Sequence, residues 1–311
     1  MSRILIIGRD GQVGFELAQA LGPLGELVSV GRDRIDLADP DAIRREVRAI
    51  RPQLIVNAAA YTAVDRAESE PELANAVNGM APGVLAEEAK RLGAPLVHYS
   101  TDYVFDGTKG TPYSEDDATS PINVYGRSKL VGEEAIRAVD PPHLILRTSW
   151  VYGRRGRNFM LTMLRLAREG QPIRVVDDQW GAPTTSKAIA SMTASVLVRL
   201  GLGLDPFTER CRAQGGVYNL TCSGQTTWFR FATRIFENAL RPGIAVPECS
   251  LESPPILTPI RTEEFPVRTP RPRHTVLSGA KLRQAFGLEM PDWSAALTEC
   301  MAGDSGPPAL D

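Results

Sequence analysis

The chain has 311 residues, of which 43% are hydrophobic and 23% charged, and its formal net charge is −2 at pH 7. These are ordinary values for a globular protein, and the near-neutral charge excludes the basic surface that attracts nucleic acid. No apolar run approaches the ~20 residues that would span a bilayer, so no membrane span is predicted.

The first half of the chain alternates short apolar runs with segments of helical periodicity. Runs that are apolar at every position are typical of parallel strands buried on both faces. The alternation therefore predicts an α/β fold, a doubly wound parallel sheet with helices on both sides. The strands are expected at residues 4–7, 27–30, 54–56, 96–99 and 144–146, and the helices at 13–21, 41–50 (capped by Asp39) and 73–92 (interrupted near Pro82).

The chain changes character after residue 150, where long helical patterns are separated by irregular segments. Residues 247–272 contain seven prolines, so neither a long helix nor a central strand is expected there, and we interpret them as an irregular wall over a site. The remaining expected elements are helices at 159–169, 185–200, 227–240, 281–286 and 293–301, a strand at 217–220 and a loop at 201–216.

This organisation predicts a nucleotide-binding Rossmann core formed by residues 1–150, to which residues of about 170–222 return. A smaller substrate lobe is expected from about 151–169 and 223–302, followed by a disordered tail at 303–311. The four cysteines form no CxxC pair and are expected to be reduced thiols of a cytoplasmic protein. The apolar run at 4–7 is too short for a signal peptide, and three scattered histidines indicate no zinc site.

A glycine motif follows the first predicted strand. Glycines let the backbone approach a pyrophosphate closely, and the N-terminus of the next helix supplies free N–H groups. The spacing is GxxGxxG rather than the commoner GxGxxG, and a glycine pattern alone would also fit a tight turn. Its place directly after the first strand of a βαβ run favours a dinucleotide site. The motif comprises Gly8, Arg9, Asp10, Gly11, Gln12, Val13 and Gly14.

The end of the second predicted strand bears on the choice of cofactor. An acidic residue there would bind the ribose hydroxyls of NADH and repel a 2′-phosphate. This chain has Gly31 and Arg32 at that place, and Arg32 can pair with a phosphate, with help from Arg9. NADPH is therefore the expected cofactor. Asp33 follows at once, so NADH stays open, and Arg32 could also be a solvated loop charge.

Tyr125 and Lys129 are spaced to share one face of a helix. A phenol is a poor acid at neutral pH, and a neighbouring ammonium is expected to lower its pKa. A tyrosine tuned in this way can donate a proton to a ketone oxygen while hydride arrives at the carbon. Thr101, at the end of the fourth predicted strand, can hold the same oxygen by a hydrogen bond.

Several longer segments resemble one family, the dTDP-4-dehydrorhamnose reductases, which are extended short-chain dehydrogenases. The resemblance runs from Ser2 to about Ala302. The segments STDYVFDG and VYGRSK are typical of the superfamily, whereas TAVDRAE, RTSWVYG and DQWGAPT point to the reductases. These segments lie at 100–107, 124–129, 62–68, 147–153 and 178–184.

The resemblance implies reduction of the 4-keto group of dTDP-4-dehydro-L-rhamnose to dTDP-L-rhamnose. Tyr125 matches the proton donor, and Lys129 matches the lysine that holds the nicotinamide ribose. Thr101 matches a contact to the sugar ketone, with Asp102 beside it, and Trp150 matches an aromatic residue of the sugar pocket. Further cofactor contacts are implied for Gly11, Gln12 and Val13 at the pyrophosphate, Asp36 and Leu37 at the adenine, and Ala60, Tyr61, Thr62 and Tyr99.

The chain departs from the family pattern at two places. Asp10 stands in the glycine loop, where Arg9 would have to offset its charge. Dimeric members can hold magnesium between subunits, but Lys187 occupies one position of that site while Glu16 occupies another. A lysine is not a magnesium ligand, so no metal is expected, and both a monomer and a homodimer stay open.

Arg271 and Trp180, in the second half of the chain, have two interpretations each. Arg271 lies in a stretch resembling a family RPxxS motif, and it could bind a nucleotide phosphate or belong to a solvated turn. Trp180 could stack on a ligand or pack in the core, whereas Trp228 and Trp293 are expected in the core.

Two other functions remain open. A nucleotide-sugar epimerase or dehydratase would use the same fold. A 4,6-dehydratase commonly needs Asp-Glu after its threonine, whereas this chain has Asp102 and Tyr103. A protein of another class, a regulatory subunit that binds NADP without turnover, could share the resemblance. The intact Tyr125, Lys129 and Thr101 favour catalysis.

Overall fold

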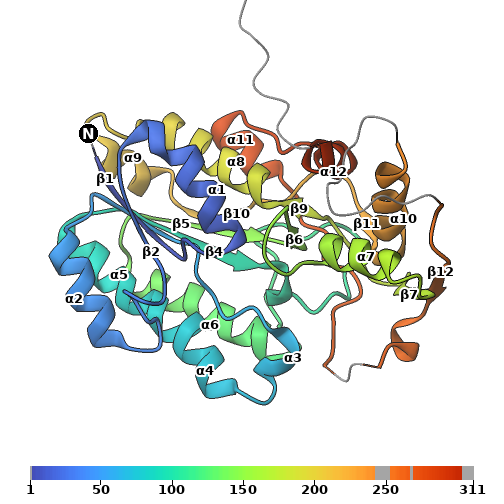
Figure 1. The fold of residues 1–311 in the computed structure, drawn as a ribbon. Helices are drawn as coiled ribbons and strands as arrows, with labels where there is room; N and C mark the ends of the chain where they lie inside the picture. The colour runs from blue at the N-terminus through green and yellow to red at the C-terminus, as the bar shows by residue number, and fades with distance from the viewer. Residues whose placement is uncertain (1, 242–252, 267–268, 303–311) are drawn as a thin grey trace, which may run out of the picture.

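A six-stranded parallel sheet runs through the middle of the molecule (Figure 1). The computed structural model describes residues 2–241, 253–266 and 269–302. The strand order is β2-β1-β3-β4-β5-β10, so the chain leaves β2 and crosses β1 to continue on its other side at β3. The strands are β1 (Arg3–Ile7), β2 (Glu26–Val30), β3 (Leu54–Asn57), β4 (Leu96–Thr101), β5 (His143–Thr148) and β10 (Gly216–Asn219).

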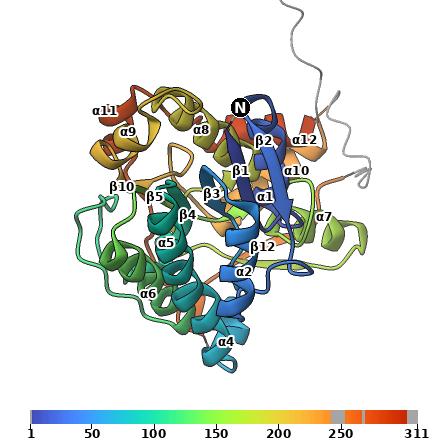
Figure 2. The same cartoon turned by 90° about the vertical axis from the view of Figure 1, so that its left-hand side faces the viewer.

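Helices cover both faces of this sheet, as Figures 1 and 2 show from two sides. In β1, Ile4 and Ile6 pack into the hydrophobic core on one face of the sheet, while Leu5 and Ile7 pack into the core on the opposite face. This two-sided burial is the reason for the continuously apolar runs, and it confirms the predicted doubly wound sheet. One layer contains α1 (Gln12–Leu21), α8 (Ser186–Arg199), α9 (Phe207–Ala213) and α11 (Ala280–Phe286); the other contains α2 (Pro40–Ile50), α5 (Ala81–Leu92) and α6 (Val124–Val139).

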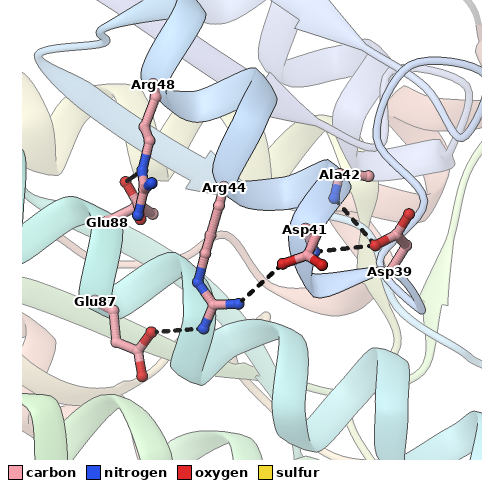
Figure 3. Close-up of polar contacts among 7 residues, drawn as sticks. All are labelled: Asp39, Asp41, Ala42, Arg44, Arg48, Glu87 and Glu88. Atoms are coloured by element: carbon pink, nitrogen blue, oxygen red, sulfur yellow. Dashed lines mark hydrogen bonds and ion pairs between the residues drawn. The ribbon is translucent and has the colours of Figure 1, made fainter.

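Charged side chains join α2 to α5 in the second layer (Figure 3). Asp39 caps α2, as predicted, by accepting hydrogen bonds from the backbone N–H groups of Asp41 and Ala42. Arg48 donates to both carboxylate oxygens of the buried Glu88. The two helices are therefore joined by a charge-assisted hydrogen bond that is shielded from water on its acidic side.

A second hydrophobic cluster lies beyond the carboxyl ends of the central strands, at the right of Figure 1. Ile173, Phe231 and Leu297 are buried in it, and each comes from a different element. Its elements are α7 (Phe159–Arg168), β7 (Ile173–Val176), α10 (Trp228–Ala239), β12 (Leu257–Ile260) and α12 (Trp293–Ala302), with β12 paired in parallel with β7. Short strand pairs connect this region to the sheet: β6 (Val151–Tyr152) with β9 (Thr184–Thr185), and β8 (Trp180–Gly181) with β11 (Thr226–Thr227).

The structure corrects the sequence prediction in two segments. The expected loop at 201–216 contains the helix α9, which buries Phe207 and Cys211 against the core. The expected irregular wall contains β12 and a short 3-10 helix, Thr262–Glu264. The rest of that wall, at 247–252 and 267–268, and the tail at 303–311 lie outside the described residues.

The long helical stretch before β4 is continuous but irregular. It consists of α4 (Pro71–Asn75), a π-helical turn (Ala76–Met80) and α5. Pro82 lies in the first turn of α5, where the missing N–H costs little, and the irregularity precedes it. A short helix, α3 (Val64–Ala67), comes before this stretch. In the part of the chain that the structure describes, no helix is long and apolar enough to cross a membrane.

Candidate active site

The glycine motif forms a close-packed turn between β1 and α1. Gly8 has a φ of 97°, a conformation that favours glycine. A Cβ atom on Gly14 would lie 2.0 Å from the carbonyl oxygen of Gly8, so no other residue fits there. Gly11 caps α1 without any side-chain hydrogen bond, which leaves the first N–H groups of the helix for a ligand. These features fit a dinucleotide pyrophosphate.

Charged side chains surround the end of β2. Arg9 donates to both carboxylate oxygens of Asp33, at 3.0 and 2.9 Å, and its Nε lies 3.6 Å from Asp10. Arg9 therefore offsets the charge of Asp10, as the sequence required. The Arg32 side chain is 73% exposed, and its Nε lies 3.8 Å from Asp36. Since Arg32 is bound only loosely, its guanidinium is free to turn toward a phosphate.

Other expected cofactor contacts lie around this turn. The Gln12 side chain accepts a hydrogen bond from Asn158, which ties the turn to the segment before α7. Tyr61, between Ala60 and Thr62 in the loop after β3, donates its backbone N–H to Asn78 and its hydroxyl to Glu70. Two further residues expected to contact the cofactor face the interior. Leu37 is buried in the sheet's core, and the Tyr99 hydroxyl hydrogen-bonds Thr193 of α8.

The predicted catalytic pair lies in the first turns of α6. Asn123 caps this helix by accepting from the backbone N–H of Gly126, and Tyr125 and Lys129 follow one turn apart. The Lys129 side chain reaches β4, where Nζ donates to the Tyr99 carbonyl oxygen at 2.6 Å and lies 3.2 Å from Nε2 of His98. The sequence placed the pair correctly but did not predict these partners.

Burial dominates the ionisation of both residues. It raises the pKa of Tyr125 to about 12, although a hydrogen bond with the Thr101 hydroxyl works in the opposite direction. It lowers the pKa of Lys129 to about 8, against the attraction of Glu133. The expected lowering of the Tyr125 pKa by Lys129 is therefore wrong, because burial dominates and Nζ of Lys129 is engaged at β4. Tyr125 is held in its protonated form, the form that a proton donor needs.

Asp102 follows Thr101 directly and shares its burial. The Thr101 hydroxyl donates to Oδ1 of Asp102 at 3.0 Å, whereas Oδ2 is buried without a hydrogen-bond partner. Burial raises the pKa of this carboxyl to about 7, although the nearby hydroxyls of Thr275 and Thr101 favour its ionised form. The ionised Asp102 in turn raises the pKa of Tyr125. Asp102 is thus a buried acid, beside Tyr125, whose pKa lies near neutral pH.

An aromatic wall lies just after β5. Trp150 has a φ of 48°, which is unusual for a residue other than glycine, and its ring stacks on Trp228 with centroids 3.5 Å apart. Gly181 lies so close that a Cβ atom there would be 2.4 Å from the Trp150 ring. Trp228 was expected in the core; it belongs to the second hydrophobic cluster but also supports Trp150. Trp180 lies under the Arg230 guanidinium, and Trp293 packs against the core as expected.

Arg271 joins the C-terminal segment to the loop after β3. It donates to both carboxylate oxygens of Asp65, at 2.9 and 3.0 Å. The neighbouring Pro270 carbonyl accepts from the side chain of Asn123, the cap of α6. The guanidinium group is therefore anchored beside the start of α6, and the interpretation of Arg271 as part of a solvated turn is wrong.

The positions considered for magnesium lie together on one cavity of about 600 Å³, which Glu16, Lys187 and Glu299 line. Nζ of Lys187 lies 3.3 Å from Oε1 of Glu299, so a cation of the protein faces this carboxylate. Within the described ranges, no three histidine, cysteine or acidic side chains gather as metal ligands. The residues present do not fit a bound magnesium ion.

The fold and the site together define a Rossmann-fold protein of the extended short-chain dehydrogenase class. Residues 1–305 match the family model described as the RmlD substrate binding domain. The chain is 46% identical over 303 residues to the dTDP-4-dehydrorhamnose reductase of Burkholderia thailandensis, covering 96% of this chain and 98% of that protein. It is 43% identical over 298 residues to the protein of that name from Escherichia coli K12, covering 94% and 95%.

A solved structure supports the same family assignment. The dTDP-4-dehydrorhamnose reductase of Bacillus anthracis, crystallised in complex with NADP, superposes with a TM-score of 0.84 at 33% identity, covering 95% of this chain and 97% of that one. The chain belongs to the dTDP-4-dehydrorhamnose reductase family.

Proposed function

We propose that this protein reduces the 4-keto group of dTDP-4-dehydro-L-rhamnose to the hydroxyl of dTDP-L-rhamnose, with NADPH as the preferred reductant. The observation that carries the proposal is the Tyr125 phenol beside the Thr101 hydroxyl, at the same edge of the sheet as the glycine turn. Ligands of open α/β sheets bind at this edge, where the strand order reverses.

The residues divide the chemistry among them. A bound reduced nicotinamide supplies the hydride. Thr101 holds the ketone oxygen, and Tyr125 donates a proton to it as the carbon is reduced. Lys129 holds the ribose and stabilises the phenolate that Tyr125 becomes. Asp102 and Trp150 contact the sugar, Trp150 being kept in place by Trp228 and by the lack of a side chain at Gly181.

The cofactor lies along the glycine turn in this proposal. Gly8, Gly11, Gln12, Val13 and Gly14 surround the pyrophosphate. Arg32 turns from Asp36 toward the 2′-phosphate of NADPH, while Arg9 stays with Asp33. Because Asp33 can also accept from ribose hydroxyls, NADH serves as a weaker substitute. The remaining contacts are Asp36 and Leu37 at the adenine, Ala60, Tyr61 and Thr62 in the loop after β3, and Tyr99 of β4.

The second hydrophobic cluster supports the division into a nucleotide-binding core and a substrate lobe. We place the lobe at about 151–169 and 223–302, with the sugar nucleotide between it and the sheet. The protein is proposed to act in the cytoplasm, where Cys211, Cys222 and Cys300 stay reduced; Cys249 lies outside the described residues. It functions as a monomer or a homodimer, on a small nucleotide-sugar substrate.

The test is a direct assay. The purified protein is mixed with dTDP-4-dehydro-L-rhamnose, generated in situ by enzymes that make it, and loss of nicotinamide absorbance is followed with NADPH and with NADH. Rapid oxidation is expected, faster with NADPH. Measurable NADPH binding without oxidation of either cofactor would overturn the proposal and favour a regulatory protein or another sugar nucleotide.

A further inference from the structure

Three buried polar side chains form a line behind the active site, from β3 through β4 to α6. Asn57 ends β3, His98 lies in β4 and Lys129 comes from α6, and each is 1% exposed. Nδ2 of Asn57 lies 3.1 Å from Nδ1 of His98, and Nε2 of His98 lies 3.2 Å from Nζ of Lys129. Each ring nitrogen of the histidine thus has one polar neighbour, and the positions of the protons along the line depend on one another.

The orientation of the Asn57 amide follows from its other contact. The backbone N–H of Ala59 donates to Oδ1 of Asn57 at 3.3 Å. A backbone N–H can only donate, so the Asn57 atom facing it is the oxygen, and the NH₂ group faces His98. The glycine turn holds Ala59 in place, since a Cβ atom on Gly8 would lie 2.8 Å from the Ala59 nitrogen. Nδ1 of His98 is therefore the acceptor of a hydrogen bond.

The proton of His98 must then lie on Nε2. Burial lowers the pKa of His98 well below its ordinary value, with a further contribution from Lys129, so the ring is neutral and carries one proton. With Nδ1 accepting, that proton points at Nζ of Lys129. An ammonium group has only donors, and two donors would face each other. A neutral amine has a lone pair that accepts from Nε2–H, and it can still donate to the Tyr99 carbonyl.

We propose that Asn57 and His98 form a proton switch that favours the neutral amine of Lys129 in the ligand-free protein, and that Lys129 takes up a proton when Nζ leaves His98 for a bound ligand. The opposite arrangement, an ammonium facing an unprotonated Nε2, requires the Asn57 amide to rotate. The NH₂ group would then face the Ala59 N–H, and a buried donor would lose its partner.

The charged groups around Lys129 are consistent with this switch. Glu133, one turn along α6, attracts the ammonium form, but Arg147 of β5 donates to both of its oxygens, at 2.9 and 2.7 Å. The attraction of Glu133 is therefore largely offset by Arg147. Tyr125, one turn earlier, is protonated and carries no charge. Since burial already lowers the pKa of Lys129 to about 8, a facing donor is enough to favour the amine near neutral pH.

The catalytic consequence rests on the proposed function, whereas the switch itself does not. If Lys129 becomes charged only beside a bound cofactor, the phenolate of Tyr125 is stabilised only when hydride is available. His98 and Asn57 would then be positioning residues of the reaction, acting through Lys129.

Nuclear magnetic resonance tests the switch without turnover, so a protein that fails to reduce the sugar can still show it. The chain has three histidines and five lysines, so few signals need assignment. Nitrogen-15 spectra of the imidazoles report the tautomer of His98, and carbon-13 labelling at lysine Cε reports the titration of Lys129. The His98→Gln and Lys129→Arg variants assign the two signals.

The expected tautomer of His98 carries its proton on Nε2, and Lys129 is expected to titrate at or below about pH 8. In His98→Gln the amide oxygen can accept from Lys129, which should raise the titration midpoint of Lys129 by about one pH unit. Asn57→Asp provides a second test in a ring-containing protein. Its carboxylate accepts from Nδ1–H, so the His98 tautomer should reverse and the Lys129 midpoint should rise.

His143→Gln is the matched control. His143 lies at the start of β5, where Nδ1 faces the Pro141 carbonyl at 2.8 Å, so this variant should leave the Lys129 titration unchanged. The proposal is overturned if His98 carries its proton on Nδ1 in the ligand-free protein. It is also overturned if Lys129 titrates near pH ~10, like an exposed lysine, or if His98→Gln does not move its midpoint.

Discussion

The hydroxyl of Thr101 donates a hydrogen bond to Oδ1 of Asp102, the residue next to it, while Oδ2 of the same carboxyl is buried without a partner. One oxygen of a buried acid is therefore satisfied and the other is not. Such a carboxyl resists ionisation, and burial raises its pKa from an ordinary 3.8 to about 7.

This carboxyl should make the protein less stable as the pH rises. The folded state holds the proton up to about pH 7, whereas the unfolded chain releases it near pH 4. The contribution of Asp102 to the free energy of unfolding is therefore fully present below the unfolded pKa. It is lost as the pH rises to about 7, by an amount on the order of 2–4 kcal/mol. Asp102→Asn should remove this dependence, because the amide keeps the bond from Thr101 and carries no charge. Urea unfolding at pH 5 and pH 8 measures both proteins.

From pH 5 to pH 8, the free energy of unfolding of the parent should fall by more than that of Asp102→Asn. If the two proteins differ in free energy of unfolding by the same amount at pH 5 and at pH 8, Asp102 is ionised in the folded state at both pH values, and water reaches its carboxylate.

Loss of the Tyr125 hydroxyl should abolish most of the proposed activity. Tyr125→Phe is expected to reduce kcat a hundredfold or more, on the scale typical of lost general acid catalysis, because a phenyl ring has no proton to give to the ketone oxygen. Binding of NADPH, measured by fluorescence, should persist, since the phenol does not hold the glycine turn. Near-normal turnover of this variant would contradict the proposed mechanism.

The preference for NADPH should depend on Arg32. Its guanidinium is exposed, and its Nε lies as far as 3.8 Å from Asp36. This ion pair is weak, so Arg32 can reach a 2′-phosphate at little cost. Arg32→Ala is expected to lower kcat/KM with NADPH about tenfold, the effect of one lost charge-assisted hydrogen bond, and to leave NADH almost unaffected. Steady-state kinetics with both cofactors measure the ratio. A variant that loses both rates equally would point to a structural role for Arg32.

The sheet and the place of the catalytic pair could be predicted because both depend on local sequence. Continuous apolar runs occur only where both faces of a strand are buried, and a spacing of four residues puts Tyr125 and Lys129 on one side of α6. The partners of Lys129 could not be predicted in this way. His98 and the Tyr99 carbonyl come from β4, and their contacts with Lys129 depend on how α6 packs against the sheet.

Two other features that the sequence did not predict, the helix α9 and the stacking of Trp228, also depend on packing. Residues 201–216 contain four glycines, which predicted a loop, yet Phe207 and Cys211 are four residues apart and bury the one face that α9 needs. Trp228 packs against the core as expected, but its contact with Trp150 was not predicted. Its stacking on Trp150 depends on the positive φ of Trp150, which no sequence pattern indicated.

The last prediction concerns two neighbouring glutamates of α5, both visible in Figure 3. The side chain of Glu88 is 3% exposed and accepts hydrogen bonds from Arg48 and Arg91, whereas that of Glu87 is 53% exposed and accepts from Arg44 alone. Burial alone would raise the pKa of Glu88, but the two arginines outweigh it and lower the pKa below its ordinary value. The two glutamates therefore make a matched pair for measuring what burial adds to a surface ion pair.

Glu88→Gln should destabilise the protein by about 1–3 kcal/mol at pH 7, the cost of losing charged hydrogen bonds at a buried group. Glu87→Gln should cost less than about 1 kcal/mol, as an exposed pair does. Because the folded pKa of Glu88 is lowered, its contribution is present above the unfolded value of 4.5 and is lost as the pH falls through the folded pKa. The difference between parent and Glu88→Gln in urea unfolding should therefore shrink toward pH 3. Equal effects of the two substitutions at pH 7 would show that water reaches Glu88, and that the link between α2 and α5 is no stronger than an ordinary surface ion pair.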